Sequence, residues 1–481
     1  MTILVYEPAI TVTVFKMIKR VNGVAQRYAG LRRQIDLTPF LGEGGVVRTS
    51  KSLGPAAGGF TISIPDQPDT VSGDTVYALV EPMDMIEIRM ARRPEKYAGT
   101  KLPLVMRGFA STITRAEAMG ADGAPERFVV IAGQDFGKLW TINAIYWRAI
   151  YFTDPEIISF WQVGAAAGMA PAIYSAGDFV SGMVAAFNKK IAGLPAFAAP
   201  ASVQPFSTDI SVTQGYTLPC QQAAIGEGTY WSILTAFADL PWNEIFIQDL
   251  EAGPQVVYRP VPYLDINGKW IGGAKDPGSF QIDISEIVSL SMSRTDDQVA
   301  NIFWVDPTNI VMGSGGGITA GTLPAGTDLD FSHQNDDPNL FGQKIMAAQT
   351  NLYADTVSAV AGASGSESAS NSSQIGWWLS RTDTLKLVNQ DNSVLESGSI
   401  SAMGREDFQI GKYLKISRGS LESTAYMTQV DHTFSVYQSW TTSIQLIRGD
   451  GFIVRNQYVG NPFWAEGRNG PYDAAMRPLA P

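Results

Sequence analysis

The sequence contains very few of the residues on which most active sites and metal centres depend. It has one cysteine, Cys220, and two histidines, His333 and His432, among 481 residues. A lone cysteine cannot form a disulfide within the chain, so the fold must be held together by packing. Because only two histidines are present to activate it, an inert thiol is favoured over a nucleophile at Cys220. The histidines are far apart and no Cys/His pair has ligand spacing, so a structural zinc site is not expected.

Basic residues are scarcer than acidic ones. The chain has 35 Lys and Arg against 46 Asp and Glu, which gives a formal net charge of −11. This balance argues against a nucleic-acid-binding surface, and we expect no specific nucleic-acid partner. Simple solubility explains the excess acid, and so would a surface past which DNA moves without sticking.

Targeting and membrane segments are not evident. The first residues carry no basic region followed by an apolar run, so we expect no signal peptide. The most apolar segment, residues 163–187, is interrupted by Pro171, Asp178 and several small residues. It does not provide the roughly 20 clean apolar residues that a membrane span requires. We therefore expect no membrane span.

The composition instead favours a β-rich protein. Hydrophobic residues make up 45% of the chain, aromatic residues 10% and charged residues only 17%, with 47 Gly and 27 Pro. Such a chain can bury a sizeable core and has many turn residues. Aromatic residues favour strands and also anchor interfaces. The length allows roughly three domains of about 150 residues each.

The pattern along the first part of the chain predicts an antiparallel β-barrel over residues 1–135. Apolar residues alternate with polar ones at 10–17, 76–90, 104–113 and 127–133, and Gly-, Asp- and Pro-rich turns separate these segments. Alternation of this kind is typical of half-buried strands. Several such strands with turns between them favour a small barrel.

The period changes at Asp135, and residues 136–254 read as a helical and α/β region. Apolar residues at helical spacing predict helices over 136–152, with Asp135 as a cap, and over 154–192, with Pro155 in the first turn. Residues 194–228 read as a loop and 230–237 as a further helix. Residues 244–248 and 255–259 read as the two strands of a hairpin.

A second strand-rich region follows, and we predict a second β-barrel from residues 255–310 and 376–455. Its expected strands are 279–293, 301–305, 385–387, 413–416, 426–434 and 441–449. Residues 311–375 form an expected insertion with a short helix at 343–353. Its Gly- and Ser-rich stretches, 312–330 and 354–374, hold few bulky residues and are predicted to be mobile surface loops. Residues 456–481 are expected to be a C-terminal tail. The predicted fold class is thus α+β and β-rich, with two barrel domains joined by an α/β region.

Motifs that carry chemistry are missing. The glycines at 313–317 are followed by Ile318, so no phosphate-binding fingerprint is present, and no nucleophile elbow exists. His432 lies in a predicted strand, where a packed, hydrogen-bonded histidine is favoured over a catalytic base. The acids of residues 328–337 lack the spacing of a calcium loop, so a solvated acidic loop is favoured there. These acids are Asp328, Asp330, Asp336 and Asp337. We therefore predict no catalytic, cofactor-binding or metal-binding residues, no cofactor, and no enzymatic activity.

One enzymatic alternative stays open, because two carboxylates suffice to hydrolyse a glycan. The acids considered for such a pair are Glu227, Glu244 and Asp249. Sequence alone does not place them in a common cleft.

Several segments, in order along the chain, resemble a known family. They include Asp84-x-Ile86-x-Ile88 with Gly108-Phe109-x-x-x-Ile113, then Gly133-Gln134-Asp135-x-x-x-Leu139, where Gln134 stands in place of the usual Arg. Tyr258-Arg259-Pro260-Val261-Pro262, the run Ser293-Arg294-Thr295-Asp296 with Asn301, and the three closing strands complete the set. Together they resemble the baseplate hub proteins of contractile-tailed bacteriophages. That family includes the late-control proteins of temperate myophages and the hub half of type VI secretion spikes.

The resemblance implies a structural role. In that family three chains form a ring, and two barrels per chain match the sixfold tail tube. The implied function is a homotrimeric adaptor that joins the tail tube ring to the central trimeric spike and contacts other baseplate proteins. The implied location is the virion tail, after assembly in the bacterial host cytoplasm. A non-contractile tail tip or a secretion machine is a further setting for the same fold, and a tail-associated peptidoglycan or glycan hydrolase is the alternative function.

Overall fold

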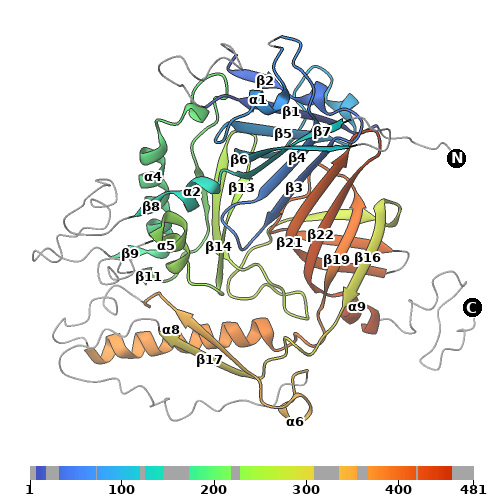
Figure 1. The fold of residues 1–481 in the computed structure, drawn as a ribbon. Helices are drawn as coiled ribbons and strands as arrows, with labels where there is room; N and C mark the ends of the chain where they lie inside the picture. Colours follow the sequence, from blue (N-terminus) through green and yellow to red (C-terminus); the bar gives the residue numbers. More distant parts are fainter. Residues whose placement is uncertain are drawn as a thin grey trace, which may run out of the picture.

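The structure is a computed structural model that describes residues 7–17, 32–71, 73–119, 125–145, 173–217, 228–307, 335–354, 367–418 and 421–457. A large, mainly antiparallel sheet dominates it, and helices α4 and α5 lie to one side of this sheet (Figure 1). The predicted α+β, β-rich class is therefore confirmed. Within the described residues no helix is both long and apolar enough to cross a membrane.

In the described part of the chain, the main sheet has thirteen strands, and it combines strands from the first third of the sequence with strands from its second half. Its path is β16-β19-β22-β21-β3-β4-β7-β6-β5-β1-β2, and β20 and β15 branch from β21. The strands from the first third of the chain are β1 (Ala9–Phe15), β2 (Gln34–Asp36), β3 (Val46–Ser52), β4 (Gly59–Pro65), β5 (Met85–Ala91), β6 (Leu104–Met119) and β7 (Pro125–Asp135). The others are β15 (Ser279–Asp283), β16 (Ile287–Ser293), β19 (Glu396–Met403), β20 (Tyr413–Arg418), β21 (Leu421–Ser435) and β22 (Ser439–Gly449).

Two parts of this sheet have the same topology. The first block consists of β3 to β7 in the spatial order β3-β4-β7-β6-β5, and the second has the order β16-β19-β22-β21-β20. The chain fills the five positions in the same sequence in both blocks, and every neighbouring pair is antiparallel. The strand-rich halves predicted from the sequence are thus related as a structural repeat. Closure of each half into a barrel stays a prediction.

The two blocks are joined edge to edge within the chain. Strand β21 pairs antiparallel with β3, from Gln429 opposite Ser52 to Ser435 opposite Val46. Residues almost 400 positions apart in sequence therefore form one continuous sheet.

The remaining strands form small sheets around this framework. β13 (Asn243–Asp249) and β14 (Pro254–Pro260) form a hairpin, and β10 (Ser207–Ile210) pairs parallel with β14. β17 (Ile302–Pro307) and β18 (Ile345–Thr350) form a parallel pair. Short pairs join β8 (Ala144–Ile145) to β12 (Gly228–Thr229) and β9 (Tyr174–Ser175) to β11 (Tyr216–Thr217).

The helices differ in length and place. The two long ones are α4 (Ala176–Ile191) and α8 (Glu367–Asn389), and α8 lies beside β17 and β18 in Figure 1. The short ones are α1 (Val76–Leu79), α2 (Lys138–Ile142), α5 (Tyr230–Ala236), α6 (Pro338–Phe341) and α9 (Gly451–Gln457). Single 3₁₀ turns lie at η1 (Thr38–Phe40), η2 (Pro94–Tyr97), η4 (Pro195–Phe197) and η6 (Ile284–Glu286).

An aromatic core packs the middle region. Trp140 of α2 is fully buried, and its ring centroid lies 4.1 Å from that of Phe187 and 5.5 Å from that of Phe206. Helix α4 supplies Phe187 and begins where the Ser175 side chain accepts a hydrogen bond from the Asp178 backbone N–H, at 3.1 Å. Such a cap satisfies an N–H that the first helical turn leaves open. Two further cores, one in each half of the main sheet, hold the blocks together.

Several predicted elements are confirmed. These are the strands near 10–17, 104–113 and 127–133, helix 230–237, the hairpin of 244–248 and 255–259, strand 301–305 and the three closing strands. In the first and last of these strands, β1 and β22, buried residues alternate with more open ones, as the apolar pattern predicts.

Other predictions were wrong. Within the helix predicted over 343–353, residues 345–350 form strand β18, because parallel pairing with β17 outweighs the helix-forming Met, Ala and Gln residues there. Residues 385–387 lie in helix α8, whose start at 367 also shortens the predicted loop 354–374. Residues 76–79 are helical, so the strand expected over 76–90 begins at 85. The helix predicted over 136–152 is confirmed over 138–142, residues 144–145 form β8 instead, and residues 146–152 lie outside the described residues.

Other predicted boundaries differ from those in the structure or fall on residues that the structure does not describe. The loop expected at 194–228 contains η4, β10 and β11, and the strand over 279–293 is divided by η6. The helix over 154–192 is described only from 176 onward. Residues 312–330 and 458–481 lie outside the described residues.

Candidate functional site

The central hairpin, β13 and β14 with their turn (Asn243–Pro260), is the element that binds both blocks of the main sheet. Charged side chains connect it to the first block at its turn and to the second block at its open end. In Figure 1 it runs between the helical side and the main sheet. We treat its charged contacts as the candidate site, because buried charges have strong geometric requirements.

The first contact is a network of two carboxylates and two guanidinium groups. Glu87 of β5 accepts from Arg89 Nε at 2.5 Å and from Arg107 Nη2 at 2.8 Å. Arg89 also binds Glu251 in the hairpin turn through two nitrogens, at 2.5 and 3.1 Å. Burial alone would raise the pKa of Glu87, but the hydrogen bonds from the two arginines hold it below its ordinary value. Glu87 therefore stays ionised and fixes both arginines toward the hairpin.

A second buried contact joins the end of β13 to β3 and β7. Lys51 donates to Asp135 and lies 3.7 Å from Asp249 Oδ2. Asp135 also accepts from the backbone N–H groups of Gly58, at 2.9 Å, and Gly137, at 2.8 Å. Burial lowers the pKa of Lys51, but the two carboxylates more than offset it and the pKa is raised. Burial raises the pKa of Asp249 to about 7, against the attraction of Lys51.

This arrangement predicts a pH-dependent stability. Asp249 has a higher pKa in the folded chain, about 7, than the ordinary 3.8. The folded state therefore holds its proton more tightly, and stability is lost as the pH rises from about 4 through 7, by at most about 1.4 kcal/mol per pH unit. We expect Asp249→Asn to weaken this decline, as measured by denaturant unfolding at several pH values.

The control for that experiment is Asp135→Asn. Asp135 is fully buried and accepts from Lys51 and two backbone N–H groups. We expect this variant to be destabilised across the whole pH range, because one oxygen acceptor becomes a donor. An Asp249→Asn protein whose stability declines with pH as steeply as the wild type would contradict the role of Asp249.

A third contact ties the hairpin to the second block. Glu244 of β13 accepts from Arg259 Nε at 2.7 Å and from the Tyr426 hydroxyl at 2.8 Å. Arg259 also donates to the carbonyl oxygen of Gly411, next to β20. Burial raises the pKa of Glu244, while Arg259 and Tyr426 oppose that rise. Tyr426 lies in β21, the strand that also pairs with β3 of the first block. The hairpin therefore contacts the same strand that joins the two blocks.

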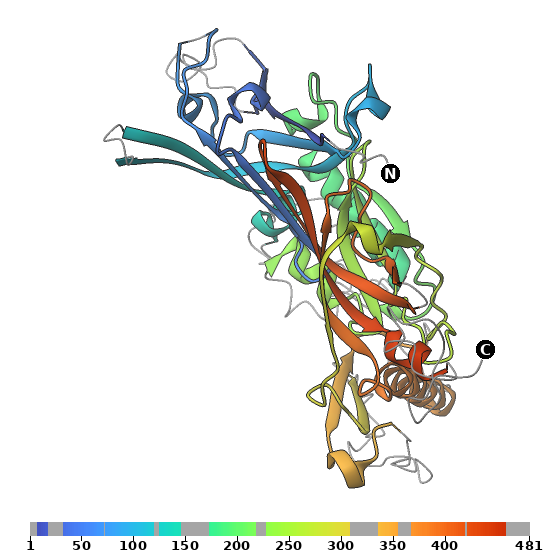
Figure 2. The same cartoon turned by 90° about the vertical axis from the view of Figure 1, so that its right-hand side faces the viewer.

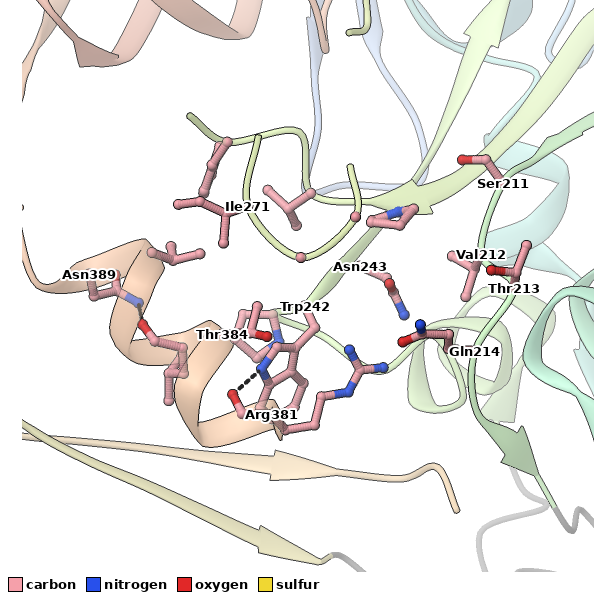
Figure 3. Close-up of a pocket in the computed structure, with 18 of the residues that line it drawn as sticks. Ser211, Val212, Thr213, Gln214, Trp242, Asn243, Ile271, Arg381, Thr384 and Asn389 are labelled. Atoms are coloured by element: carbon pink, nitrogen blue, oxygen red, sulfur yellow. Dashed lines mark hydrogen bonds between the residues drawn. The ribbon is translucent and has the colours of Figure 1, made fainter. Parts of the chain in front are cut away.

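A pocket of about 340 Å³ lies between the open end of the hairpin and helix α8 (Figure 3). Its wall is mixed, with Trp242 and Tyr263 on the hairpin side and Thr384 and Leu385 on the helix. Figure 3 shows the guanidinium group of Arg381 directed toward Asn243 and Gln214. Arg381 is held by Asp239, at 2.8 Å, and its guanidinium carbon lies 4.1 Å from the ring centroid of Trp377.

The charge at this pocket is already balanced. Burial raises the pKa of Asp239, against the attraction of Arg381 and the hydrogen bond from Thr350 at 2.6 Å. The pKa of Arg381 is lowered by its own burial. A buried pair of this kind fixes helix α8 to the hairpin. Among the described residues that line the pocket, the single charged side chain, Arg381, is thus already neutralised by Asp239.

The structure separates the acids considered from the sequence. Glu244 and Asp249 lie at opposite ends of β13, each committed to its own basic partner, so they do not form a catalytic pair. Asp337 caps α6 by accepting from the Asn339 backbone N–H, and Asp336 is buried. Among the described residues no three Asp, Glu, His or Cys side chains form a group that could hold a metal ion.

His432 is the packed strand residue that was predicted. It is buried in β21, its Nδ1 lies 2.9 Å from Thr442 Oγ1, and burial lowers its pKa to about 4. The other candidates lie outside the described residues: Cys220, Glu227, Asp328, Asp330 and His333.

Sequence reasoning missed the residues of the buried contacts on the first block. Lys51 lies in β3, a strand that was not predicted, and Glu87, Arg89 and Arg107 lie in predicted strands without a proposed role. The available signal was their position: charged residues inside the apolar runs of β5 and β6 require buried partners.

Comparisons with known proteins give matches in structure alone. No family model matches the sequence, and no curated protein matches it. Across its length the chain matches solved structures of phage tail proteins and of a secretion-system component. A tail protein from Neisseria meningitidis MC58 is 10% identical with a TM-score of 0.43, covering 93% of this chain and 98% of that chain.

Two further matches have similar values. The 43 kDa tail protein of prophage MuSo2 from Shewanella oneidensis is 8% identical with a TM-score of 0.45, again covering 93% and 98% of the two chains. An Escherichia coli component of the type VI secretion system, described as similar to the T4 tail proteins gp27 and gp5, is 6% identical with a TM-score of 0.37. That match covers 84% of this chain and 73% of the other. Such likeness concerns the arrangement of the chain and assigns no role to any residue.

Proposed function

We propose that this chain is a structural protein of a phage tail baseplate. More specifically, we propose that it is a homotrimeric hub that joins the hexameric tail tube ring to the central trimeric spike. Its further partners would be other baseplate proteins, and its location the virion tail after assembly in the host cytoplasm. It would use no cofactor and catalyse no reaction.

The observation that carries this proposal is the repeat of five strands within one chain. The blocks β3–β7 and β16–β22 share strand order, chain sequence and antiparallel pairing, and they lie side by side in one sheet. Three chains that each supply two equivalent blocks present six, which is what a threefold adaptor to a sixfold ring requires. The repeat therefore supports a role in which a threefold ring connects to a sixfold ring, and such a role requires no catalysis.

The segments that resemble the hub family also supply contacts within the first block and between the hairpin and the second block. Asp135 binds Lys51, and Arg259 binds Glu244 and the Gly411 carbonyl. Asp84, in the first of these segments, accepts from the backbone N–H groups of Met17 and Glu81. These motif residues thus form ion pairs and hydrogen bonds that stabilise the fold, as expected of residues in a structural protein.

The domain layout is part of the proposal. Residues 1–135 would form the first barrel, 136–254 the middle region, and 255–310 with 376–455 the second barrel. The insertion of 311–375 would lie outside both barrels. Proteolysis of the purified protein tests this layout, since cleavage should concentrate within the insertion. Early cleavage inside either block would argue against it.

The alternative function is a tail-associated peptidoglycan or glycan hydrolase, and we expect no such activity. Glu244 and Asp249 each hold a basic side chain, and His432 is buried and neutral at pH 7. A pure preparation should leave peptidoglycan intact in a turbidity assay. Reproducible clearing that one carboxylate or serine substitution abolishes would contradict the proposal and favour the hydrolase.

A further inference from the structure

Strand β21 shows how two blocks are joined by pairing between their strands. Its first part, Leu421–Tyr426, pairs with β20 of its own block. The register against β22 then shifts between Met427 and Gln429. Beyond that bulge the same edge of β21 pairs with β3, the first strand of the other block. A β-bulge bends its strand and can end the pairing with one neighbour, so that the next part of the same edge is able to pair with another strand.

Strand β6 occupies the same place in the first block and has the same form. Its first part pairs with β5, from Leu104 to Phe109, and its register against β7 shifts between Ala110 and Thr112. Beyond this bulge, no strand among the described residues pairs with this edge of β6. The side chains from Ser111 to Met119 are exposed apart from Ile113, and the β6–β7 hairpin projects from the body in Figure 2.

Strand β16 is the counterpart of β3. It is the first strand of its block and the last strand of the main path, and its sole described partner is β19. Its sequence, Ile-Val-Ser-Leu-Ser-Met-Ser, contains no charged residue and no proline. Edge strands that must avoid pairing usually carry such residues.

The ends of β16 are held in place. Glu286, just before it, lies 3.3 Å from Arg405 and also accepts from Arg92 of the first half. Arg294, just after it, lies with its guanidinium carbon 3.4 Å from the ring centroid of Phe452. Both ends of β16 are thus held in place, while its outer edge has no partner strand in the described part of the chain.

We infer that β16 of one copy pairs with the outer part of β6 in a second copy, by the same edge-to-edge contact that joins β3 to β21 within the chain. Equivalent positions in the two blocks follow from the pairing of each strand with its neighbours. Transferring the register of β21 against β3 on this basis places Thr114 opposite Ser293, Ala116 opposite Ser291 and Ala118 opposite Ser289. This inference rests on the proposed homotrimer and names the strands that close it. The contact is heterologous, so repetition forms a ring when the rotation closes.

The side chains of the two strands suit this pairing. Thr114, Ala116 and Ala118 share one face of β6, and Ser289, Ser291 and Ser293 share the corresponding face of β16. The charges on β6 are already paired within the chain, Arg115 to Asp66 at 2.9 Å and Glu117 to Arg127 at 3.1 Å. Small, uncharged pairs allow two backbones to approach without electrostatic cost.

Cysteine cross-linking tests the register directly. In a Cys220→Ser background, Ser293→Cys and Thr114→Cys are introduced into separate chains, which are mixed and treated with a short bismaleimide. We expect a cross-linked product from the mixture and none from either variant alone. The positive control is Ser50→Cys with Asp431→Cys in one chain, since these residues are the equivalent opposed pair of the internal junction. The negative control is Ser399→Cys mixed with Thr114→Cys, because Ser399 lies on the interior strand β19.

Each outcome decides the inference. Cross-linking of Ser293→Cys with itself would show that β16 meets β16 and would overturn the assignment. No cross-link from the mixture, either in the purified chain or in assembled tail tips, would overturn it as well. Mixed cross-links in a protein that is not found in tails would support the contact while rejecting the adaptor. A three-copy ring in the tail without cross-links would support the adaptor and reject the proposed contact.

Discussion

Replacing Glu87 by Ala is expected to lower the free energy of unfolding by about 3–5 kcal/mol, because it leaves two buried guanidinium groups without their shared carboxylate. Glu87 is 5% exposed, Arg89 4% and Arg107 5%, so water cannot replace the lost partner. Arg89 would keep Glu251 and the Leu102 carbonyl oxygen, at 2.6 Å. Urea unfolding followed by tryptophan fluorescence measures the change.

The matched control is Glu117→Ala. Glu117 pairs with Arg127 across β6 and β7, but both side chains are about half exposed, at 50% and 48%. Exposed pairs contribute at most about 1 kcal/mol, so this variant should unfold close to the wild type. Equal losses for the two variants would show that the Glu87 network has no special structural role.

A loss of similar size, about 3–5 kcal/mol, is expected for Trp140→Ala. Trp140 is fully buried among Phe187, Phe206 and Tyr230, and its removal leaves a cavity that these packed side chains can fill only in part. Calorimetry or denaturant unfolding would show the change. Trp304→Ala is the control, since Trp304 lies on β17 with 38% of its surface exposed. If the control lost as much stability as Trp140→Ala, the aromatic core would not be the main support of the middle region.

The sequence predicted elements well where burial follows a simple period. The closing strands β21 and β22 alternate buried and open residues, and α5 begins at a Thr229 cap that accepts from Ser232 N at 3.1 Å. Both signals are local, so they can be read from neighbouring residues. Strand β18 was mistaken for a helix because its Met and Ala residues favour one, while pairing with β17 decides the outcome.

The junction of the blocks could not be read from the sequence. Strands β3 and β21 pair across most of the chain length, and β3 itself, with Ser, Thr, Lys and Arg residues, has little apolar signal. The same limit applies to the candidate site. Lys51, Asp135 and Asp249 meet through three separate strands, and only the folded sheet brings them together. The sequence pattern showed two strand-rich halves. Which strand of one half corresponds to which strand of the other could be decided only from the strand order in the folded sheet.

Imaging the assembled tail tip by cryo-electron microscopy tests the central claim most directly. The account predicts three copies of this chain in one ring, placed between the tail tube and the spike, with six equivalent five-strand blocks around the axis. Six copies in the ring, or a single copy on the axis, would contradict the adaptor.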